Sequence, residues 1–194
     1  ALMEMLDIKE IHFCEYALRE GVLYEQLETL KCHSIKQHTV DNLMARFAID
    51  TKQEENVSQL ALSFYDKIAQ DWKLTKKIYR ELLQWACQLH ELGVDINPSG
   101  YHKHGEYILS NADLAGFNQE QQTALAWLIG NQRKKITPAK SHQWYLLDKN
   151  ALTKICALLR LAILLCQQRQ LSFLPEYEVT AKGKALNISF PAQW

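Results

Sequence analysis

Apolar residues recur at helical spacing over most of the chain. Between residues 57 and 68 the apolar positions are Val57, Leu60, Ala61, Phe64 and Ile68. Intervals of three and four residues place such side chains on one face of a helix, which is then buried. Similar patterns predict helices that begin near residues 34, 75, 101, 118 and 150. The last of these, from 152 to about 168, is the most apolar, and we expect it to be central. The predicted fold is therefore mainly α.

Polar residues mark where these helices are expected to begin. Four positions precede a periodic apolar segment and have a side chain suited to a helix start: Ser34, Asp50, Thr75 and Asn118. Asp50 and Asn118 are followed three residues later by glutamine, which is the pattern of a capping box. Asn150 is the expected cap of the most apolar helix. Gly93 is expected to end the helix that begins at Thr75.

The pattern changes near both ends of the chain. Residues 8–13 read as a short extended run and residues 16–25 as one helix. One strand and one helix cannot bury themselves, so we expect residues 1–27 to be the end of another domain. At the other end, residues 176–180 and 185–190 alternate between apolar and polar, with Lys182-Gly183 between them. This pattern predicts a β-hairpin that belongs to a larger, truncated domain.

Composition excludes several kinds of partner. Lysine plus arginine and aspartate plus glutamate both total 22, so no net charge attracts DNA or an anionic membrane, and an anion site must be a local cluster. No apolar stretch is long enough to span a bilayer, and the chain does not open with a signal peptide. The five cysteines form no C-x-x-C motif, which is typical of a reduced, cytoplasmic protein.

An imidazole and a carboxylate adjoin at His90 and Glu91, at the end of a largely apolar helix. Burying both is costly unless they are paired or bind a ligand. Together with His38 and His104 they could hold a divalent ion of a hydrolase. The alternative is that His90 donates to a backbone carbonyl or pairs with Glu91. The zinc-protease motif H-E-x-x-H is absent, because Val94 stands four residues after His90.

A second possible site consists of basic residues beside helix ends. The cluster comprises Lys36, His38, His102, Lys103, His104, Arg133, Lys134 and Lys135. Cations gathered near helix termini bind phosphate well, and arginine adds a bidentate geometry. The alternative is a set of ordinary solvated surface charges. No glycine-rich phosphate loop and no G-x-S-x-G motif is present, so neither a P-loop nor a serine hydrolase is predicted.

Several stretches resemble one family. Residues 17–24, Ala-Leu-Arg-Glu-Gly-Val-Leu-Tyr, resemble the end of the catalytic region in exopolyphosphatases and guanosine pentaphosphate phosphohydrolases, the Ppx/GppA family. Residues 87–93, 107–117 and 158–163 are similar to the helical C-terminal region of the same family. The resemblance covers nearly the whole chain and is specific to this family.

The resemblance implies a division into three parts. Residues 1–27 would end the actin-like catalytic domain, which precedes them and contains the magnesium site and the catalytic residues. Residues 28–148 would form a helical domain similar to the HD fold, which is named for a metal-binding His-Asp pair. Residues 149–194 would supply a helix and a β-hairpin of a truncated small α+β domain. On this interpretation the chain itself has no catalytic residue and no cofactor.

The chain departs from the HD pattern at several ligand positions. His38 and His90 match the two histidines, but the paired aspartate is Glu91. The late aspartate of the pattern is Ile163, whose side chain cannot bind a cation, and residues 131–132 are Asn-Gln where relatives often have a further histidine. We therefore expect a degenerate HD shell without a metal ion.

The sequence then predicts a non-catalytic region that binds extended phosphate. The expected phosphate-binding residues are Lys36, His38, His102, His104, Arg133 and Lys134. Expected partners are polyphosphate or guanosine pentaphosphate, the chain's own N-terminal catalytic domain, and a second copy in a homodimer; DNA and membranes are not expected. Two alternatives remain open: a metal-dependent HD phosphohydrolase with variant ligands, and a dimerisation module without a ligand.

Overall fold

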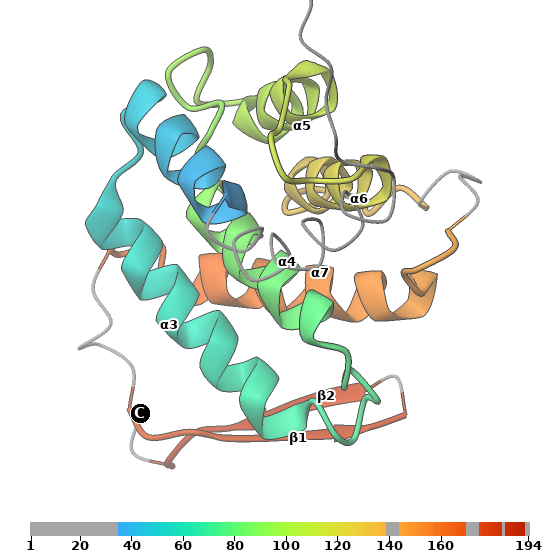
Figure 1. The fold of residues 1–194 in the computed structure, drawn as a ribbon. Coiled ribbons are helices and arrows are strands. Elements are labelled where there is room, and N and C mark those ends of the chain that lie inside the picture. The colour runs from blue at the N-terminus through green and yellow to red at the C-terminus, as the bar shows by residue number, and fades with distance from the viewer. Residues whose placement is uncertain (1–34, 139–143, 170–174, 184, 193–194) are drawn as a thin grey trace, which may run out of the picture.

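The computed structural model describes residues 35–138, 144–169, 175–183 and 185–192. Residues 35–46 form the first described helix (Figure 1). Five more helices and two strands follow: α3 (Thr51–Ile68), α4 (Lys77–Gln88), α5 (Tyr101–Asn111), α6 (Gln119–Gly130), α7 (Lys149–Leu165), β1 (Glu178–Lys182) and β2 (Ala185–Ser189). The prediction of a mainly α fold with a C-terminal hairpin is confirmed. The β-α remnant predicted for residues 1–27 lies outside the described residues.

The helices pack around α7. Helices α3, α4 and α6 all contact α7, and α5 packs mainly against α6 (Figure 1). Buried side chains from α3, α4, α6 and α7 form one hydrophobic core, which confirms the central place of α7. This core includes residues on both sides of position 148, where we placed a domain boundary; the boundary itself stays a prediction. None of the helices in the described part of the chain has the length and apolarity needed to cross a membrane.

Two helices begin as their capping residues predict. The Asn118 side chain accepts from the Gln121 N–H, and the Gln121 side chain accepts from the Asn118 N–H, so the capping box of α6 is complete. The Asp50 carboxylate likewise caps α3 by accepting from the N–H groups of Lys52 and Gln53. The predicted capping box of α3 is wrong in its second hydrogen bond, from the Asp50 N–H to the Gln53 side chain. The Gln53 amide donates instead to the distant carbonyl of Cys166.

Two other helix starts were predicted wrongly. Helix α4 begins at Lys77 with Lys76 at the N-cap, without a side-chain cap from Thr75. Helix α7 begins before the expected cap Asn150, because the Asp148 carboxylate accepts from the Ala151 N–H at 2.8 Å. It ends at residue 165, about three residues earlier than the pattern predicted. Ser34, the expected cap of the first helix, lies outside the described residues.

Helix 35–46 packs one face against the core. Ile35 is 39% exposed, whereas Val40 and Leu43 are buried. Met44 and Phe47 are partly buried against the core, as expected from the apolar spacing.

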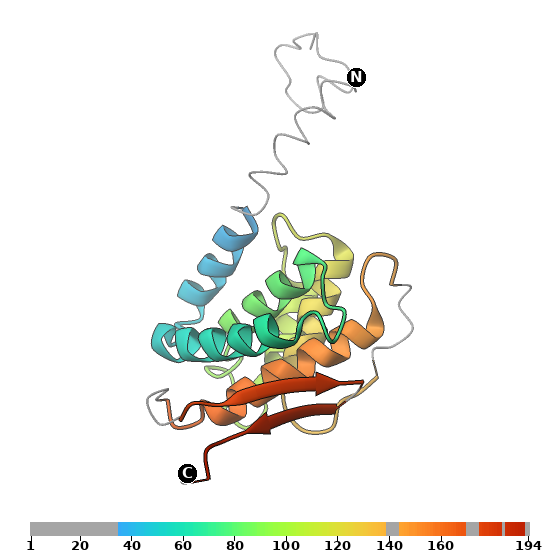
Figure 2. The same ribbon diagram turned by 90° about the horizontal axis from the view of Figure 1, so that it is seen from below.

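The hairpin covers the last turns of α3. Strands β1 and β2 are antiparallel, with Val179 opposite Ile188, and lie along one side of the helices (Figure 2). Just before β1, the Tyr177 ring meets the Phe64 ring edge to face, with 5.2 Å between centroids. The Tyr177 hydroxyl is 2.7 Å from the Ser63 hydroxyl. These contacts fix the hairpin to α3 by both apolar and polar interactions.

Helices α5 and α6 approach closely because glycine stands at their contact. A Cβ atom added at Gly105 would lie 2.7 Å from the Ile129 side chain. One added at Gly130 would meet the Glu106 carboxylate, and one at Gly93, in the turn after α4, would meet the Tyr101 carbonyl. The turn after α4 is therefore pressed against the start of α5, which positions the residues described next.

Candidate functional site

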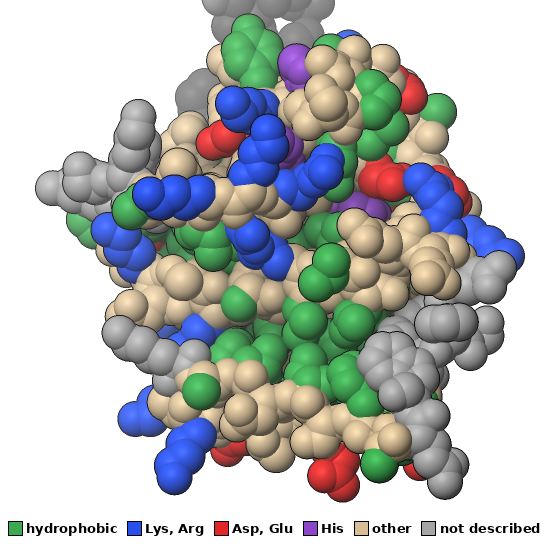
Figure 3. All heavy atoms as spheres, turned by 180° about the vertical axis from the view of Figure 1, so that it is seen from behind, with side chains coloured by type: hydrophobic (Ala, Val, Ile, Leu, Met, Phe, Trp, Pro, Cys, Tyr) green, Lys and Arg blue, Asp and Glu red, His purple; other side chains and the backbone are tan. Residues whose placement is uncertain are grey.

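A groove of about 650 Å³ lies on the outer side of α7. Its lining comes from the start of α3, the turn after α4, the first residue of α5, the loop after α6, and α7 itself. Figure 3 shows the back of the molecule, where Lys and Arg side chains gather beside a hydrophobic surface. The groove thus brings together residues far apart in the sequence, including His90, Glu91, Arg133 and Lys134.

His90 is a buried, neutral histidine. Its side chain is only 1% exposed, and Nδ1–H donates to the Cys87 carbonyl oxygen at 2.7 Å. Burial penalises the charged form and lowers the pKa of His90 to about 4, although the bond to Cys87 opposes this change. Of the two arrangements expected for His90, the structure therefore has the bond to a backbone carbonyl.

Glu91 forms an ion pair with Arg169, a residue outside the predicted site. Arg169, just after α7, donates from Nη2 to the Glu91 carboxylate at 3.0 Å, and its Nη1 bonds the Asp50 carboxylate. Burial raises the pKa of Glu91, and the Arg169 charge opposes that rise. One guanidinium therefore joins the ends of α3, α4 and α7. No sequence signal links Arg169 to residues 78 and 119 positions away.

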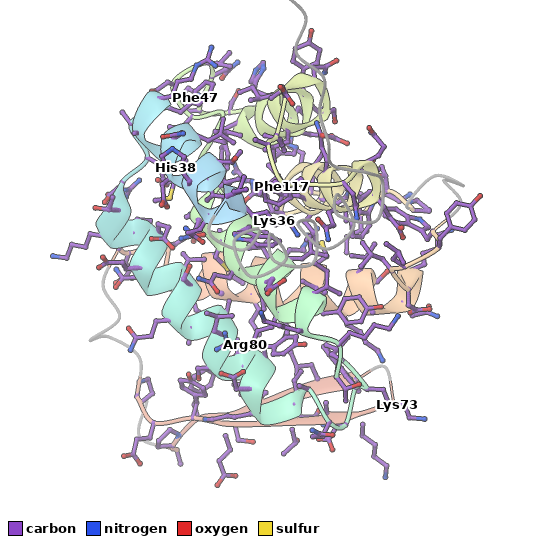
Figure 4. All side chains as sticks on the ribbon, in the orientation of Figure 1. Lys36, His38, Phe47, Lys73, Arg80 and Phe117 are labelled. Carbon is purple, nitrogen blue, oxygen red and sulfur yellow. The ribbon has the colours of Figure 1, made fainter. Side chains whose placement is uncertain are left out.

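The HD-pattern residues do not converge. His38 is exposed on helix 35–46 (Figure 4), whereas His90 is buried and Glu91 pairs with Arg169. Ile163 lies on the groove wall. Within the ranges that the structure describes, no three His, Cys, Asp or Glu side chains are grouped so that they could hold a metal ion. The residues present therefore do not fit the ligand set of an HD metal centre.

Part of the predicted basic cluster lies at the groove. The Arg133 guanidinium is 5.0 Å from the centre of the Tyr101 ring, and Lys134 follows it along the rim. Arg160, on α7, donates to the carbonyls of Asn131 and Lys134 at 2.9 and 2.7 Å. It holds the loop after α6 in place and adds positive charge beneath it. No sequence pattern identifies Arg160, because its role depends on the tertiary contact between α6 and α7.

Two histidines of the prediction lie beside this rim, on α5. His102 is buried, and its Nδ1 has no hydrogen-bond partner among the described residues. Its pKa is lowered first by burial and then by the positive charges of Lys134, Arg133, Lys103 and His104. These side chains are therefore close enough to influence one another, although neither histidine lines the groove. His104 is half-buried and next to the turn that contains Gly100.

Lys36 and His38 lie on a separate element and do not line the groove. The Lys36 ammonium is 5.6 Å from the centre of the Trp85 ring and 5.9 Å from that of Phe117 (Figure 4). Such cation–π contacts already stabilise the charge. The structure thus divides the predicted phosphate-binding residues into three pairs: Arg133 and Lys134 at the groove, His102 and His104 beside it on α5, and Lys36 and His38 on helix 35–46. Whether any of these pairs binds phosphate stays a prediction.

Buried amides shape the loop that presents the basic residues. Asn131 donates to the Trp127 carbonyl at 2.8 Å and accepts from the Thr137 N–H and hydroxyl at 2.7 and 2.9 Å. Gln132 donates from Nε2 to the His90 carbonyl at 2.8 Å. These two amides tie the loop after α6 to its own helix and to the turn after α4. The Asn-Gln pair therefore has a structural role at this position.

Residues 35–194 match the family described as Ppx/GppA phosphatase, domain III. The match covers more than four-fifths of the chain and includes every described helix and strand. It agrees with the family resemblance of the separate stretches in the sequence. This chain therefore belongs to the Ppx/GppA phosphatase family.

Proposed function

We propose that this chain is the non-catalytic C-terminal region of an exopolyphosphatase or guanosine pentaphosphate phosphatase, and that its groove binds extended phosphate. The parent protein would hydrolyse terminal phosphoanhydride bonds with magnesium in its catalytic domain. One observation carries the proposal. Arg133 and Lys134 lie on the rim of the groove, and Arg160 of α7 donates to the Lys134 carbonyl and so positions their loop.

Electrostatics supports this use of the groove. The chain as a whole has no net charge, so attraction of an anion depends on local groups. Arg133 and Lys134 are exposed and have no ion pair with a carboxylate among the described residues. Basic residues after a helix also complement its dipole, which alone would explain their presence. Their position on the rim of a concave surface favours a binding role.

The chemistry of the site favours binding over catalysis. His90 is neutral and already donates to a carbonyl, and the Glu91 carboxylate is paired with Arg169. Neither group is arranged to activate a water molecule. The residues that a phosphoanhydride hydrolase needs for that step would belong to the parent's catalytic domain.

The test is a measurement of tripolyphosphate binding to the whole chain by calorimetry at low and high salt. Replacing both Arg133 and Lys134 with alanine should weaken binding at least tenfold, and salt should weaken binding to the unmodified chain. Lys182→Ala, which removes one exposed charge from β1, far from the groove lining, is a control for the loss of surface charge. Lys36→Ala should have a smaller effect than the groove variant, because the Lys36 ammonium lies over two aromatic rings.

The outcomes separate the proposal from its rivals. Equal affinity for tripolyphosphate in the double variant and in Lys182→Ala would contradict it. Tightly bound transition metal with turnover by the chain alone would favour an HD phosphohydrolase. Self-association at micromolar concentration without phosphate binding would favour a dimerisation module.

We also propose the domain packing and homodimer expected from the family, in the cytoplasm. The outer face of α7 supports this, because Leu164 there is 59% exposed and Leu161 half-exposed. Cys87, Cys156 and Cys166 are free, buried thiols, which suits a reducing compartment. Sedimentation of the full-length protein beside Leu164→Asp tests the homodimer: dissociation is expected, and an unchanged dimer would exclude this face.

A further inference from the structure

A second cavity, of about 530 Å³, lies at the paired helices α5 and α6. These helices pack side by side (Figure 1), and the rest of the lining comes from residues 137–138 and Trp144. Among the described residues, none lines both this cavity and the groove along α7. Cavities of this size hold small organic ligands. The second cavity is therefore an independent candidate for a binding site.

Hydrogen-bond donors on the helical side of the cavity are already used within the chain. Gln122 donates from Nε2 to the carbonyl oxygens of Leu109 and Ala112, at 2.7 and 2.8 Å. Both of its amide hydrogens are therefore occupied. The Thr123 hydroxyl likewise donates to the Gln119 carbonyl at 2.7 Å. The Gln122 and Thr123 side chains thus have acceptor positions to offer a ligand, and no donor.

The loop side of the cavity repeats this arrangement. The Trp127 indole N–H donates to the Thr137 carbonyl at 3.1 Å, and the Thr137 hydroxyl donates to the Asn131 amide oxygen at 2.9 Å. The groups still open to a ligand are the Gln122 amide oxygen and the hydroxyl oxygens of Thr123 and Thr137. The Gln122 oxygen accepts no hydrogen bond from the described residues, and it is not enclosed away from solvent. These oxygens suit a ligand that is rich in N–H donors.

Charge and aromatic surface narrow the ligand further. Glu106 of α5 is the one charged residue in the described lining, which includes no lysine, arginine or histidine. A carboxylate has about four acceptor positions, so it can accept from a ligand as well as from a protein group. The rings of Trp127 and Trp144 also line the cavity, and indole faces attract cations. The lining therefore favours a cation over an anion.

We propose that this cavity binds a primary alkylammonium ion. The ammonium group donates to the Glu106 carboxylate and the Gln122 oxygen, and its alkyl part lies against the indole rings. A phosphate ion would be repelled by Glu106. A neutral diol could donate to the same oxygens, but it would gain nothing from the carboxylate charge. Free polyamines and lysine side chains both carry the ammonium group, and the test separates these two sources.

Two matched ligands test the proposal on the whole chain. Putrescine and 1,4-butanediol have the same carbon chain, and only putrescine is charged. Calorimetry in an amine-free buffer should show putrescine binding about tenfold or more tightly than the diol, and salt should weaken this binding. The indole N–H signal of Trp127 in an NMR spectrum should shift on addition of putrescine, because that ring lines the cavity. Tighter binding of Nα-acetyl-lysine amide than of putrescine would identify a protein lysine as the source of the ammonium group, and the reverse a free polyamine.

Variants of the lining locate the binding. Glu106→Gln removes the charge with little change of shape, so putrescine should bind about tenfold more weakly. Glu178→Gln, at an exposed position of β1 outside the cavity lining, is the matched control and should bind putrescine as the unmodified chain does. Thr123→Val removes one acceptor and should weaken binding several-fold. A thermal melt shows whether each variant is folded, and Thr123→Val tests the cavity even if the Glu106 variant is not.

Equal affinity for putrescine and the diol would overturn the proposal, as would equal affinity for putrescine in the Glu106 and Glu178 variants. The double alanine variant of Arg133 and Lys134 should keep its affinity for putrescine, because these residues line the groove and not the second cavity. A failure of tripolyphosphate binding would therefore contradict the proposed function and leave the ammonium site intact.

Discussion

The two ends of α3 lie in different surroundings. Near its start, Gln53 and Glu54 are buried polar residues, and the Glu54 carboxylate accepts from the Ser58 hydroxyl at 2.7 Å. Near its end, the buried residues include Phe64 and Ile68, which pack beneath the hairpin. Burial of apolar surface stabilises the fold, whereas buried polar groups mainly fix which partner each group bonds. The apolar end therefore provides stability, and the polar end gives the groove its shape.

The largest loss of stability is expected from Phe64→Ala, at the apolar end of α3. The ring is fully buried and contacts Tyr177, so its removal leaves a cavity between α3 and the hairpin. The expected loss is about 3–5 kcal/mol in the free energy of unfolding, measured with urea. Tyr107→Ala, at an exposed position on α5, should change it by no more than about 0.5 kcal/mol. A loss below about 1 kcal/mol in Phe64→Ala would contradict the assignment of stability to this end.

The groove beside the polar end of α3 should make stability sensitive to pH through His90, which lines it from the turn after α4. Its pKa is lowered to about 4 in the folded chain, mainly by burial, from the ordinary value of 6.5. Between these values the unfolded chain binds more protons, so stability rises with pH and is lost as pH falls from 6.5 to 4. The loss attributable to His90 is about 3 kcal/mol.

Unfolding measured from pH 4 to 7 should therefore show a smaller pH dependence in His90→Asn than in the unmodified chain. His38→Asn, at an exposed position, is the control and should leave the profile as it is. Glutamates with raised pKa values act in the opposite direction, but they are present in all three proteins and cancel in the comparison. If stability changed equally with pH in His90→Asn and in the unmodified chain, the pKa of His90 would not be lowered by folding.

Asn131→Ala should affect stability less than Phe64→Ala, and it should also weaken binding at the groove. The change removes three hydrogen bonds and leaves the Thr137 N–H without its partner, at a cost of about 1–3 kcal/mol. The loop that presents Arg133 and Lys134 then loses its anchor, so tripolyphosphate should bind several-fold more weakly. Phe64→Ala, assayed under conditions where it is folded, should keep its affinity. Loss of affinity in both variants would remove the distinction between the two ends.

Much of the fold follows from local patterns in the sequence. The apolar spacing of α3, the complete capping box of α6 and the alternation in the hairpin each depend on residues close together in the chain, and each is confirmed. The starts of α4 and α7 were misplaced because several polar residues precede each helix. Asp148 rather than Asn150 caps α7, a choice that depends on which side chain reaches the free N–H of Ala151.

The site was less predictable, because its contacts join distant residues. Periodicity placed His90 and Glu91 together at the inner end of α4, but the pairing of Glu91 with Arg169 depends on how α7 packs. The basic residues of the rim were identified as a cluster, whereas Arg160 was not, since its bonds run to backbone carbonyls that have no side-chain signature. Lys36 was grouped with the rim on charge alone, and tertiary structure placed it over two aromatic rings instead.

The glycine contacts between α5 and α6 have a consequence for local unfolding. Because α5 packs chiefly on α6, its backbone amides are protected only while that pair stays closed. In a hydrogen-exchange experiment α5 should open at a lower free energy than α3 and α7, and the exposed Tyr107 side would not delay it. The first residue of α5, Tyr101, would separate from Arg133 in the same opening. Amides at the groove rim should therefore exchange at rates close to those of α5 and faster than those of the core.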